Sequence, residues 1–291
     1  MLKKAIFKYK KNSEDSFFNL QGAQNELFSI LVDFQKFCED YDIQFSLTYG
    51  SLLGAAREKD IIKWDDDIDL MMTSDNVSKL MSFRDKLSDY NLCSYHYSST
   101  KNIYTNEVRI YRKGIYRLLE DNGKKFLTPL CVDIFPFEKI DNYNADESLK
   151  YEKILNKITK LKKILILKES KYNSKTKLRY FLRQIKKMMY AFKTSRSLHK
   201  LIDIEISKLY TGDDDYSYFS PFANESFKVT FKKEFFDKII KLEFRDMMAY
   251  SIADYDTFLT KVYNKWRVPV DRYGGSSNDF VFVKRESEIQ K

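Results

Sequence analysis

Cysteine, histidine, glycine and proline are all scarce in this chain of 291 residues. The 8 Gly and 4 Pro are too few for a collagen-like or low-complexity protein. The three cysteines, Cys38, Cys93 and Cys131, are odd in number and far apart, which argues against a disulfide framework or a zinc ribbon. Because only His96 and His199 are available, a histidine-rich metal site is excluded. We therefore expect any catalytic machinery to consist of carboxylates.

The sequence also lacks a long apolar run. No stretch approaches the roughly 20 residues that a membrane-spanning helix needs. Residues 1–11 carry positive charge without the apolar segment of a secretory signal. We therefore expect a cytoplasmic protein that is soluble or bound at the inner face of the cell membrane. Hydrophobic residues make up 43% of the chain, which is enough for a folded core.

Positive charge is concentrated in one segment. Residues 150–200 contain 17 Lys and Arg against two Glu, a local net charge of +15. Since the whole chain carries +9, the other 240 residues carry −6. This distribution indicates an acidic globular body with a cationic segment rather than a uniformly basic nucleic-acid coat. We expect no nucleic-acid partner.

Hydrophobic periodicity predicts an α+β fold. In the first half of the chain, segments with helical spacing are 20–42, 52–59 and 76–90. Segments typical of strands are 43–49, 68–72, 92–98, 106–112, 115–120 and 130–135. The turn Asp121-Asn122-Gly123 predicts a hairpin between the last two of these strands.

From residue 146 onward the pattern becomes helical. The predicted helices there are 151–167, 177–192, 199–210 and 254–265. We therefore expect a catalytic core over 1–145, with a small mixed sheet flanked by helices. A basic helical segment over 146–200 and a helical C-terminal region over 201–291 would complete the fold.

The most informative stretch runs from Thr48 to Leu70. Its acidic cluster enters an apolar strand, so Asp65, Asp67 and Asp69 would project to one side of that strand. Carboxylates on one face repel one another unless a cation neutralises them. Oxygen ligands of this kind suit Mg²⁺ or Mn²⁺. The pattern predicts a metal site, and the alternative is a solvated acidic turn.

A second feature precedes this cluster by about fifteen residues. The Gly50-Ser51 turn would place backbone N–H groups at the start of a helix, where they can bind phosphate. A phosphate site followed by a metal-binding Asp pair is what phosphoryl or nucleotidyl transfer requires.

Two ordered motifs resemble those of the LicD family of phosphotransferases. The first is Leu52-Leu53-Gly54-Ala55-x-Arg57, followed by Trp64-Asp65-Asp66-Asp67-Ile68-Asp69. The second is Val132-Asp133-Ile134-Phe135-Pro136. The resemblance extends over 47–137, and a weaker similarity follows at 253–263. Asp60 and Lys63 stand where the family usually has Gly and Pro.

The resemblance implies a nucleotidyltransferase-like fold and a metal-dependent transferase. Such an enzyme moves a phospho-substituent, such as phosphocholine from CDP-choline, to a hydroxyl of a cell-surface glycan. The resemblance assigns Asp67 and Asp69 as the metal-binding pair and Asp133 as a third carboxylate from a neighbouring strand. It places Asp65 beside them, as a ligand or as a support for the ligands, and Asp66 pointing away.

Other polar residues receive roles from the same chemistry. Ser51 and the N–H groups after Gly50 would hold phosphate oxygens of the donor. Arg57 would add a charge-assisted contact to them, or would instead form a surface ion pair. We interpret Arg109 and Arg112 as solvated strand residues.

Two other functions stay open. A template-independent nucleotidyltransferase that moves NMP to a small molecule or an RNA end would share the Gly-Ser and Asp-x-Asp chemistry. A non-catalytic module for glycan assembly would have less need to confine three carboxylates. The basic helices of 150–200 would contact anionic lipid near a lipid-linked acceptor, or would pack on the catalytic domain with their lysines in water.

Overall fold

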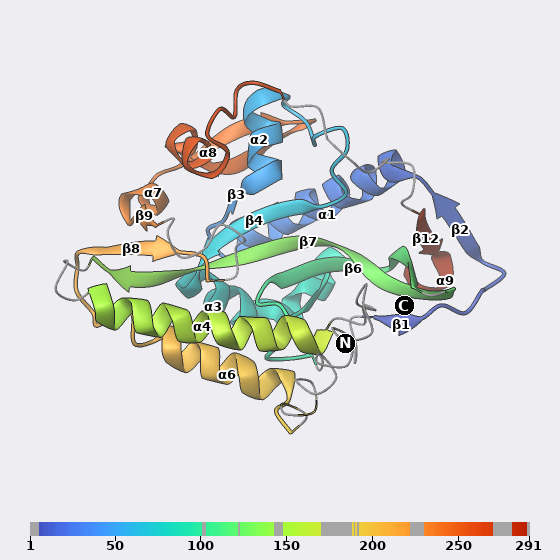
Figure 1. Ribbon diagram of the computed structural model, residues 1–291. Helices are drawn as coiled ribbons and strands as arrows, with labels where there is room; N and C mark the ends of the chain where they lie inside the picture. Colours follow the sequence, from blue (N-terminus) through green and yellow to red (C-terminus); the bar gives the residue numbers. More distant parts are fainter. Residues whose placement is uncertain are drawn as a thin grey trace.

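The chain folds around one mixed β-sheet with helices on its surfaces (Figure 1). The computed structural model describes residues 6–100, 103–121, 123–142, 148–169, 188, 190, 192–221, 230–269 and 281–289. The helices of these parts are α1 (Leu20–Asp40), α2 (Tyr49–Arg57), α3 (Ser74–Phe83), the 3₁₀ helix η1 (Arg84–Tyr90), α4 (Ser148–Glu169), α6 (Ser195–Ile206), α7 (Glu234–Asp237), α8 (Tyr255–Tyr263) and α9 (Glu286–Ile289).

The strands of the described parts fall into two sheets. The central sheet contains β1 (Phe7–Lys8), β2 (Asp15–Phe18), β3 (Ser46–Leu47), β4 (Ile68–Thr73), β5 (Cys93–Tyr95), β6 (Val108–Asp121), β7 (Lys124–Asp141), β8 (Tyr216–Phe219), β9 (Phe231–Lys232) and β12 (Val281–Arg285). Its main path runs β2-β12-β6-β7-β4-β3. On this path β4 and β7 are parallel, and the other pairs are antiparallel. The second sheet is the hairpin of β10 (Ile239–Phe244) and β11 (Met247–Ile252).

The main hydrophobic core covers one face of β4 and β7. Alternate residues of these strands, Ile68 and Leu70 on β4 and Val132 and Ile134 on β7, are fully buried. They belong to one cluster with the apolar stripe of α1. Because strand side chains alternate between faces, the residues between these four project from the opposite face of the sheet.

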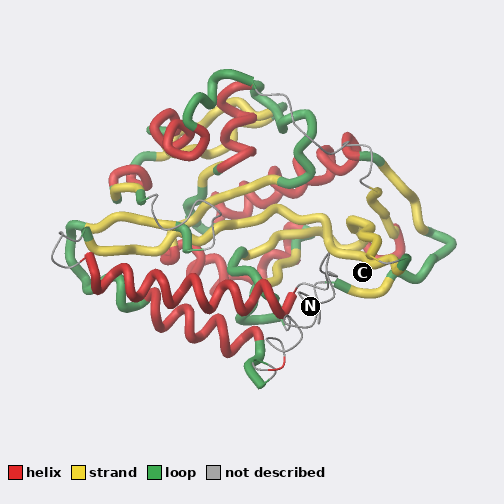
Figure 2. Tube along the Cα trace, in the orientation of Figure 1, coloured by secondary structure: helices red, strands yellow, loops and turns green. Residues whose placement is uncertain are grey.

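A second apolar cluster joins α4 and α6 to the end of β7 and to β8. The two helices run side by side (Figure 2). The buried members on α4 are Tyr151, Leu155, Ile158, Leu161 and Leu165. Lys157 of α4 also reaches Glu205 of α6, with 2.6 Å between Nζ and Oε1. α4 is therefore a packed layer of the fold, with its apolar side already covered by protein.

The structure confirms the α+β class and the mixed sheet flanked by helices. The predicted hairpin is present, with Asp121 of β6 opposite Lys124 of β7. The strands predicted at 106–112 and 115–120 form one strand, β6, whose register shifts between Tyr111 and Tyr116. The helix predicted at 76–90 is α3 followed by η1. The helix predicted at 177–192 lies almost entirely outside the described residues.

The prediction that 201–291 is helical was wrong for much of that region. It contains α7, α8 and α9, but it also contains strands β8 to β12. Most of these strands are short, and the β10–β11 hairpin turns at Arg245, which has a positive φ of 54°. The turn consists of Arg245 and Asp246, and a single Asp without Gly, Pro or Asn beside it is a weak turn signal. β12 lies between β2 and β6, so this region supplies a strand to the central sheet.

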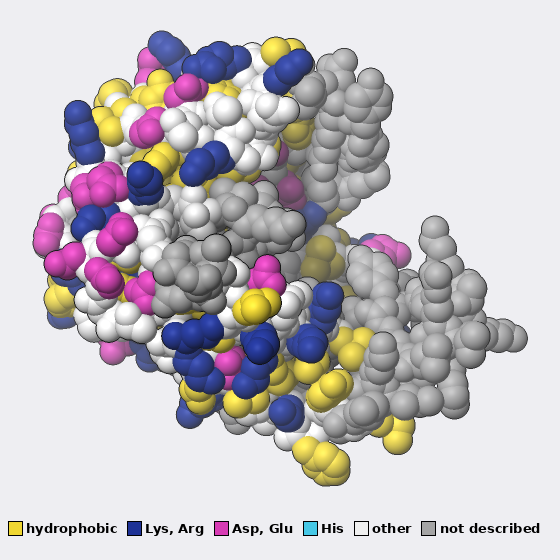
Figure 3. Space-filling model, turned by 60° about the vertical axis from the view of Figure 1, so that its left-hand side comes forward, with side chains coloured by type: hydrophobic (Ala, Val, Ile, Leu, Met, Phe, Trp, Pro, Cys, Tyr) yellow, Lys and Arg dark blue, Asp and Glu magenta, His cyan; other side chains and the backbone are white. Residues whose placement is uncertain are grey.

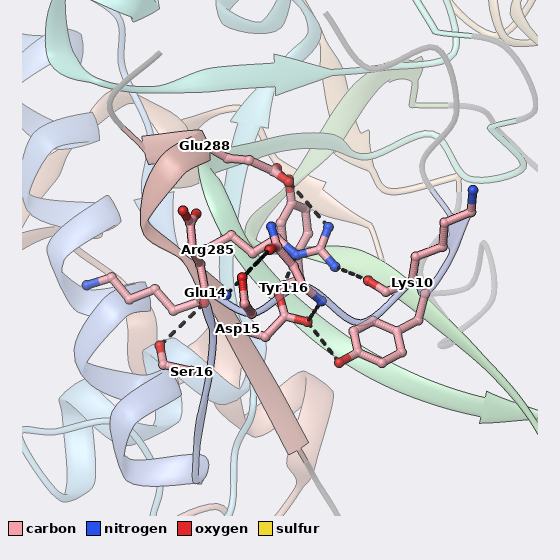
Figure 4. Close-up of polar contacts among 11 residues, drawn as sticks. Lys10, Glu14, Asp15, Ser16, Tyr116, Arg285 and Glu288 are labelled. Carbon is pink, nitrogen blue, oxygen red and sulfur yellow. Dashed lines mark hydrogen bonds and ion pairs between the residues drawn. The ribbon is translucent and has the colours of Figure 1, made fainter.

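A buried ion-pair network fastens β12 to the beginning of the chain (Figure 4). Nε of Arg285 lies 2.7 Å from Oδ1 of Asp15, and Oδ2 of Asp15 accepts a hydrogen bond from the Tyr9 hydroxyl at 2.8 Å. Arg285 also contacts Glu288 at 3.3 Å, and Glu288 accepts a hydrogen bond from Tyr116. The Asp15 side chain is 1% exposed. Its negative charge therefore depends on Arg285 for compensation.

We predict that Arg285→Met lowers the free energy of unfolding by about 3 kcal/mol, because it leaves the Asp15 charge buried without its partner. Lys59→Met is the matched control. It breaks the exposed Lys59–Glu243 pair and should cost about 1 kcal/mol or less. Urea denaturation followed by circular dichroism measures both. Equal effects of the two substitutions would contradict the role given to the network.

Candidate active site

Two carboxylates lie side by side at the centre of the sheet. Asp69 of β4 and Asp133 of β7 are direct partners in the parallel ladder. Their neighbours in each strand are buried in the core, so both carboxylates project from the opposite face. Asp67 precedes β4 by one residue and is exposed to solvent. The structure thus brings Asp69 and Asp133 together, as the sequence predicted.

A side chain of α1 binds the loop that carries the acidic cluster. Nε2 of Gln24 donates to the carbonyl oxygens of Ile62, at 3.1 Å, and Asp65, at 2.8 Å. Gln24 is 3% exposed. A buried amide that binds two loop carbonyls fixes the path of the backbone just before the carboxylates. Sequence reasoning missed this residue, because a glutamine within a helix gives no sign of a partner 41 positions away.

The loop also packs closely against two glycines of α2. A Cβ atom added at Gly50 would lie 2.7 Å from Oδ2 of Asp65, and one added at Gly54 would lie 2.4 Å from the carbonyl oxygen of Asp60. Both distances are far shorter than a van der Waals contact. Gly54 is therefore required because the backbone of the acidic loop lies directly on the helix, whereas at position 50 only the Asp65 side chain would have to move. Asp65 is placed at the N-terminal end of α2, beside Gly50.

The start of α2 is tied to the middle of β4. The Ser51 hydroxyl oxygen accepts a hydrogen bond from the N–H of Asp69 at 2.8 Å. The N–H of Thr48 donates to the carbonyl oxygen of Asp69 at 3.0 Å. Ser51, which is predicted to bind donor phosphate, therefore also holds β4 in place through this hydrogen bond. Its hydroxyl hydrogen remains available to donate a second hydrogen bond. Gly50 and Ser51 lie next to the carboxylates, at the N-terminus of a nine-residue helix.

Arg109 holds Asp133 from the neighbouring strand. Its Nε lies 3.0 Å from Oδ1 of Asp133, and its Nη1 donates to the Tyr95 hydroxyl at 3.3 Å. The thiol of Cys131 donates to the same Asp133 oxygen at 3.2 Å. The interpretation of Arg109 as a solvated residue was therefore wrong. β6 and β7 pair Arg109 directly with Asp133, and that register could not be read from the sequence.

Two other predicted residues lie away from these carboxylates. Arg112, interpreted as solvated, is instead bonded to Asp33 and to Ser29 of α1. Arg57 is at the opposite end of α2 from Gly50, where it pairs with Glu58 at 2.5 Å. This contact favours the ion-pair interpretation of Arg57 over the phosphate contact.

The remaining aspartate of the cluster is bound to the sheet. Asp66 forms an ion pair with Arg117 of β6. Its charge is thus compensated by a cation of the protein, which distinguishes it from Asp67 and Asp69. This placement agrees with leaving Asp66 out of the catalytic set.

The carboxylates strongly perturb one another. Loss of hydration and the charges of nearby carboxylates raise the pKa of Asp67 to about 7 and raise the pKa of Asp69 well above its usual range. Because the Asp67 side chain is still exposed to water, we attribute its shift chiefly to the neighbouring charges. A pKa raised above the ordinary 3.8 means that the Asp67 carboxyl stabilises the metal-free fold at low pH. That contribution is lost as the pH rises through about 7.

A further carboxylate that the sequence analysis did not single out lies nearby. Glu107 immediately precedes β6 and is 8% exposed. Burial raises its pKa, and its charge contributes to the raised pKa of Asp69. The only signal in the sequence is its position two residues before Arg109, which places both on one face if the strand extends that far.

The donor atoms at this site are suited to a hard divalent cation. Among the described residues, no three His, Cys, Asp or Glu side chains stand close enough together to hold a metal ion as they are. The chemistry of the donors nevertheless fits Mg²⁺ or Mn²⁺, because carboxylates of two adjacent strands lie side by side, and burial and neighbouring negative charges raise the pKa of Asp67 and Asp69. A bound cation would relieve this repulsion.

Comparison with known proteins places this site in a family. Residues 42–160 match the family model described as LicD/FKTN/FKRP, nucleotidyltransferase domain. This range contains Gly50, Ser51 and all the carboxylates described above. The segment 42–160 is therefore similar to the LicD family. The two LicD motifs identified in the sequence thus form one structural unit, the α2–β4 connection and the adjacent strand β7.

A curated relative supports the same assignment. The chain is 31% identical over 128 residues to the lipopolysaccharide cholinephosphotransferase LicD of Haemophilus influenzae. The alignment covers 42% of this chain and 46% of that protein. The chain therefore matches about half the length of this relative.

We predict that Gly54→Ala lowers the stability of the LicD-type segment more than Gly50→Ala does. The Cβ at position 54 meets the rigid backbone of Asp60, whereas the Cβ at position 50 meets the end of the Asp65 side chain, which can rotate away. Overpacking of this kind costs about 1–3 kcal/mol. Thermal denaturation measures the difference. If Gly54→Ala were as stable as wild type, the close packing of loop and helix would be contradicted.

Proposed function

We propose that the protein is a metal-dependent phosphotransferase of the LicD type. It would move a phospho-substituent, such as phosphocholine, from a CDP-activated donor to a hydroxyl of a cell-surface glycan. The observation that carries the proposal is the pairing of Asp69 with Asp133, beside Asp67, within the segment that matches the family. The name of the relative, a lipopolysaccharide cholinephosphotransferase, supports phosphocholine as the group and lipopolysaccharide as the type of acceptor.

In this proposal Asp67, Asp69 and Asp133 hold Mg²⁺ or Mn²⁺, with Asp65 beside them. The cation, when bound, neutralises charge on the donor diphosphate and on the leaving nucleotide. The N–H groups at the start of α2 and the Ser51 hydroxyl bind phosphate oxygens of the donor. A carboxylate such as Asp133 takes the proton of the attacking hydroxyl. Arg109 is a positioning residue, because it fixes the orientation of the Asp133 carboxylate.

We predict that Asp69→Asn and Asp133→Asn each lower turnover by about 100-fold or more while the protein remains folded. Asn has nearly the same shape but lacks the charge that binds the cation. Asp66→Asn is the matched control within the same acidic cluster, because Asp66 is paired with Arg117. It should keep turnover close to wild type. Steady-state assays at saturating Mg²⁺ measure all three, and full activity of Asp69→Asn would refute the assignment.

The products distinguish phosphotransfer from nucleotidyl transfer. With CDP-choline and a lipopolysaccharide acceptor, phosphotransfer releases CMP and attaches phosphocholine to the glycan. A nucleotidyltransferase would instead attach CMP to its acceptor and release phosphocholine, or would release pyrophosphate from CTP. Phosphorus-31 NMR of the reaction mixture identifies the products. Release of CMP with labelled glycan supports the proposal, whereas pyrophosphate from CTP with no reaction of CDP-choline rejects it.

We further propose that α4 faces a membrane that carries the acceptor. Its exposed lysines are Lys150, Lys153, Lys157, Lys160 and Lys163, of which Lys157 pairs with Glu205. Lys and Arg side chains gather on the lower part of the molecule in Figure 3. Because the apolar side of α4 is covered by protein, the contact would be electrostatic and not an insertion. None of the described helices is long and apolar enough to span a membrane.

We predict that vesicles containing anionic lipid sediment the protein at low salt and that neutral vesicles do not. Each lysine near an anionic surface contributes about 1 kcal/mol, which salt screens. Replacing Lys150, Lys153, Lys160 and Lys163 with Gln should abolish sedimentation and leave turnover on a soluble acceptor unchanged. Equal sedimentation of this variant and wild type would show that α4 is not the contact.

A further inference from the structure

A cavity lies on the side of the sheet away from the paired carboxylates. It has a volume of about 370 Å³ and is bounded by α3, by α6 and by the end of β7. Pro136 and Glu138 of β7 line it. Their positions alternate with that of Asp133, so their side chains project from the opposite face of the strand. We refer to this space as the α3–α6 cavity.

The lining of the α3–α6 cavity is acidic. Glu138 and Asp203 both line it, and none of its lining residues is Lys or Arg. His96 also lines the cavity, but burial lowers its pKa to about 4, so it is neutral at physiological pH. Nearby cations already have partners: Lys139 pairs with Asp75 at 2.9 Å, and Arg196 donates to the carbonyl oxygen of Ser98, which lines the cavity.

The two carboxylates are only partly satisfied by neutral donors. Asp203 accepts a hydrogen bond from the Tyr97 hydroxyl at 2.8 Å, and Glu138 accepts one from Ser74. Burial raises the pKa of both carboxyl groups, that of Glu138 to about 7. Neutral partners therefore do not compensate the cost of holding two negative charges in this cavity.

An independent feature of the lining points to a ligand. Asn106 lines the cavity and is 4% exposed, yet its Oδ1 atom has no hydrogen-bond partner among the described residues. Buried side-chain polar atoms are generally hydrogen-bonded. Asn106 comes from the segment before β6, whereas Glu138 and Asp203 come from β7 and α6. Three parts of the chain thus bring hydrogen-bond acceptors to one cavity whose lining includes no Lys or Arg.

We propose that the α3–α6 cavity is a second ligand site, which binds a small molecule bearing a primary ammonium group. An –NH₃⁺ group supplies a positive charge for Glu138 and Asp203. It also supplies up to three N–H donors, enough to reach the Asn106 amide as well. A quaternary ammonium group has the charge but no donor, so it would leave Asn106 unsatisfied. A neutral alcohol of similar size would leave the charge uncompensated.

Isothermal titration calorimetry of the full chain tests the site. Ethanolamine is the probe, with choline and ethylene glycol as comparisons, at pH 8, which is above the pKa of about 7 of Glu138. The experiment contains Mg²⁺ and no donor, so its outcome is separate from that of the proposed transferase activity. We expect ethanolamine to bind with 1:1 stoichiometry, choline more weakly, and ethylene glycol not at all.

Matched variants locate the binding. Glu138→Gln and Asp203→Asn should each weaken ethanolamine binding by about tenfold or more, because each removes one charge-assisted hydrogen bond. Both variants are expected to fold, since they remove charges that burial disfavours. Glu243→Gln, which breaks only the exposed Lys59–Glu243 pair outside the lining, should bind as wild type does.

Asp69→Asn should also bind ethanolamine as wild type does, which excludes the catalytic carboxylates as the site. The proposal is overturned if ethanolamine does not bind, if Glu138→Gln binds it equally well, or if choline binds as tightly as ethanolamine.

Discussion

The register that places Asp69 beside Asp133 on two parallel strands is the constraint on which the rest of the site depends. Neighbouring strands are about 4.8 Å apart, so two carboxylates in one register are forced together. The apolar residues that flank each carboxylate in its own strand are fully buried. A shift of one residue would therefore bury the carboxylates and expose the core. Burial of the apolar residues thus keeps the two carboxylates close together despite the repulsion between their negative charges.

Several surrounding contacts keep this crowded site rigid. Gln24 binds the carbonyls of the acidic loop, Ser51 binds the backbone of Asp69, and Arg109 binds the carboxylate of Asp133. The first contact fixes the loop, the second fixes strand β4, and the third fixes the orientation of the Asp133 side chain. Gly50 and Gly54 let the loop approach α2 closely enough for these contacts to form. Such preorganisation is useful in a site that must hold a cation and phosphate groups.

The sequence was informative where function depends on residues close together in the chain. Asp67 and Asp69 stand two positions apart at the entry to an apolar strand, and the Gly-Ser turn precedes them, so local spacing identified them. Asp133 was found through its motif. Arg109 could not be assigned, because its role depends on the pairing of β6 with β7. The α3–α6 cavity was equally hidden, since Glu138 and Asp203 lie 65 positions apart and meet only in the folded protein.

The C-terminal region shows a different limit of sequence reasoning. β12 enters the central sheet between β2 and β6, and Arg285 secures it to Asp15. The pairing of β12 with β2 and the contact of Arg285 with Asp15 join residues near the two ends of the chain. No local pattern near residue 285 indicates such a partner. Short strands with ordinary turn residues, such as β10 and β11, were likewise read as part of a helical region. Tertiary contacts decide these elements more than intrinsic propensity does.

The central claim is that the carboxylates are held together at a cost to stability which a divalent cation relieves. The most direct test is urea denaturation of wild type and Asp69→Asn, each at pH 8 with a chelator and with Mg²⁺. Without metal, the Asn variant should be the more stable protein, because it removes a repelling charge. With Mg²⁺, wild type should be stabilised more than the variant, since ligand binding to the folded state adds to its stability. If wild type were the more stable protein without metal and Mg²⁺ stabilised neither, the account of this site would be contradicted.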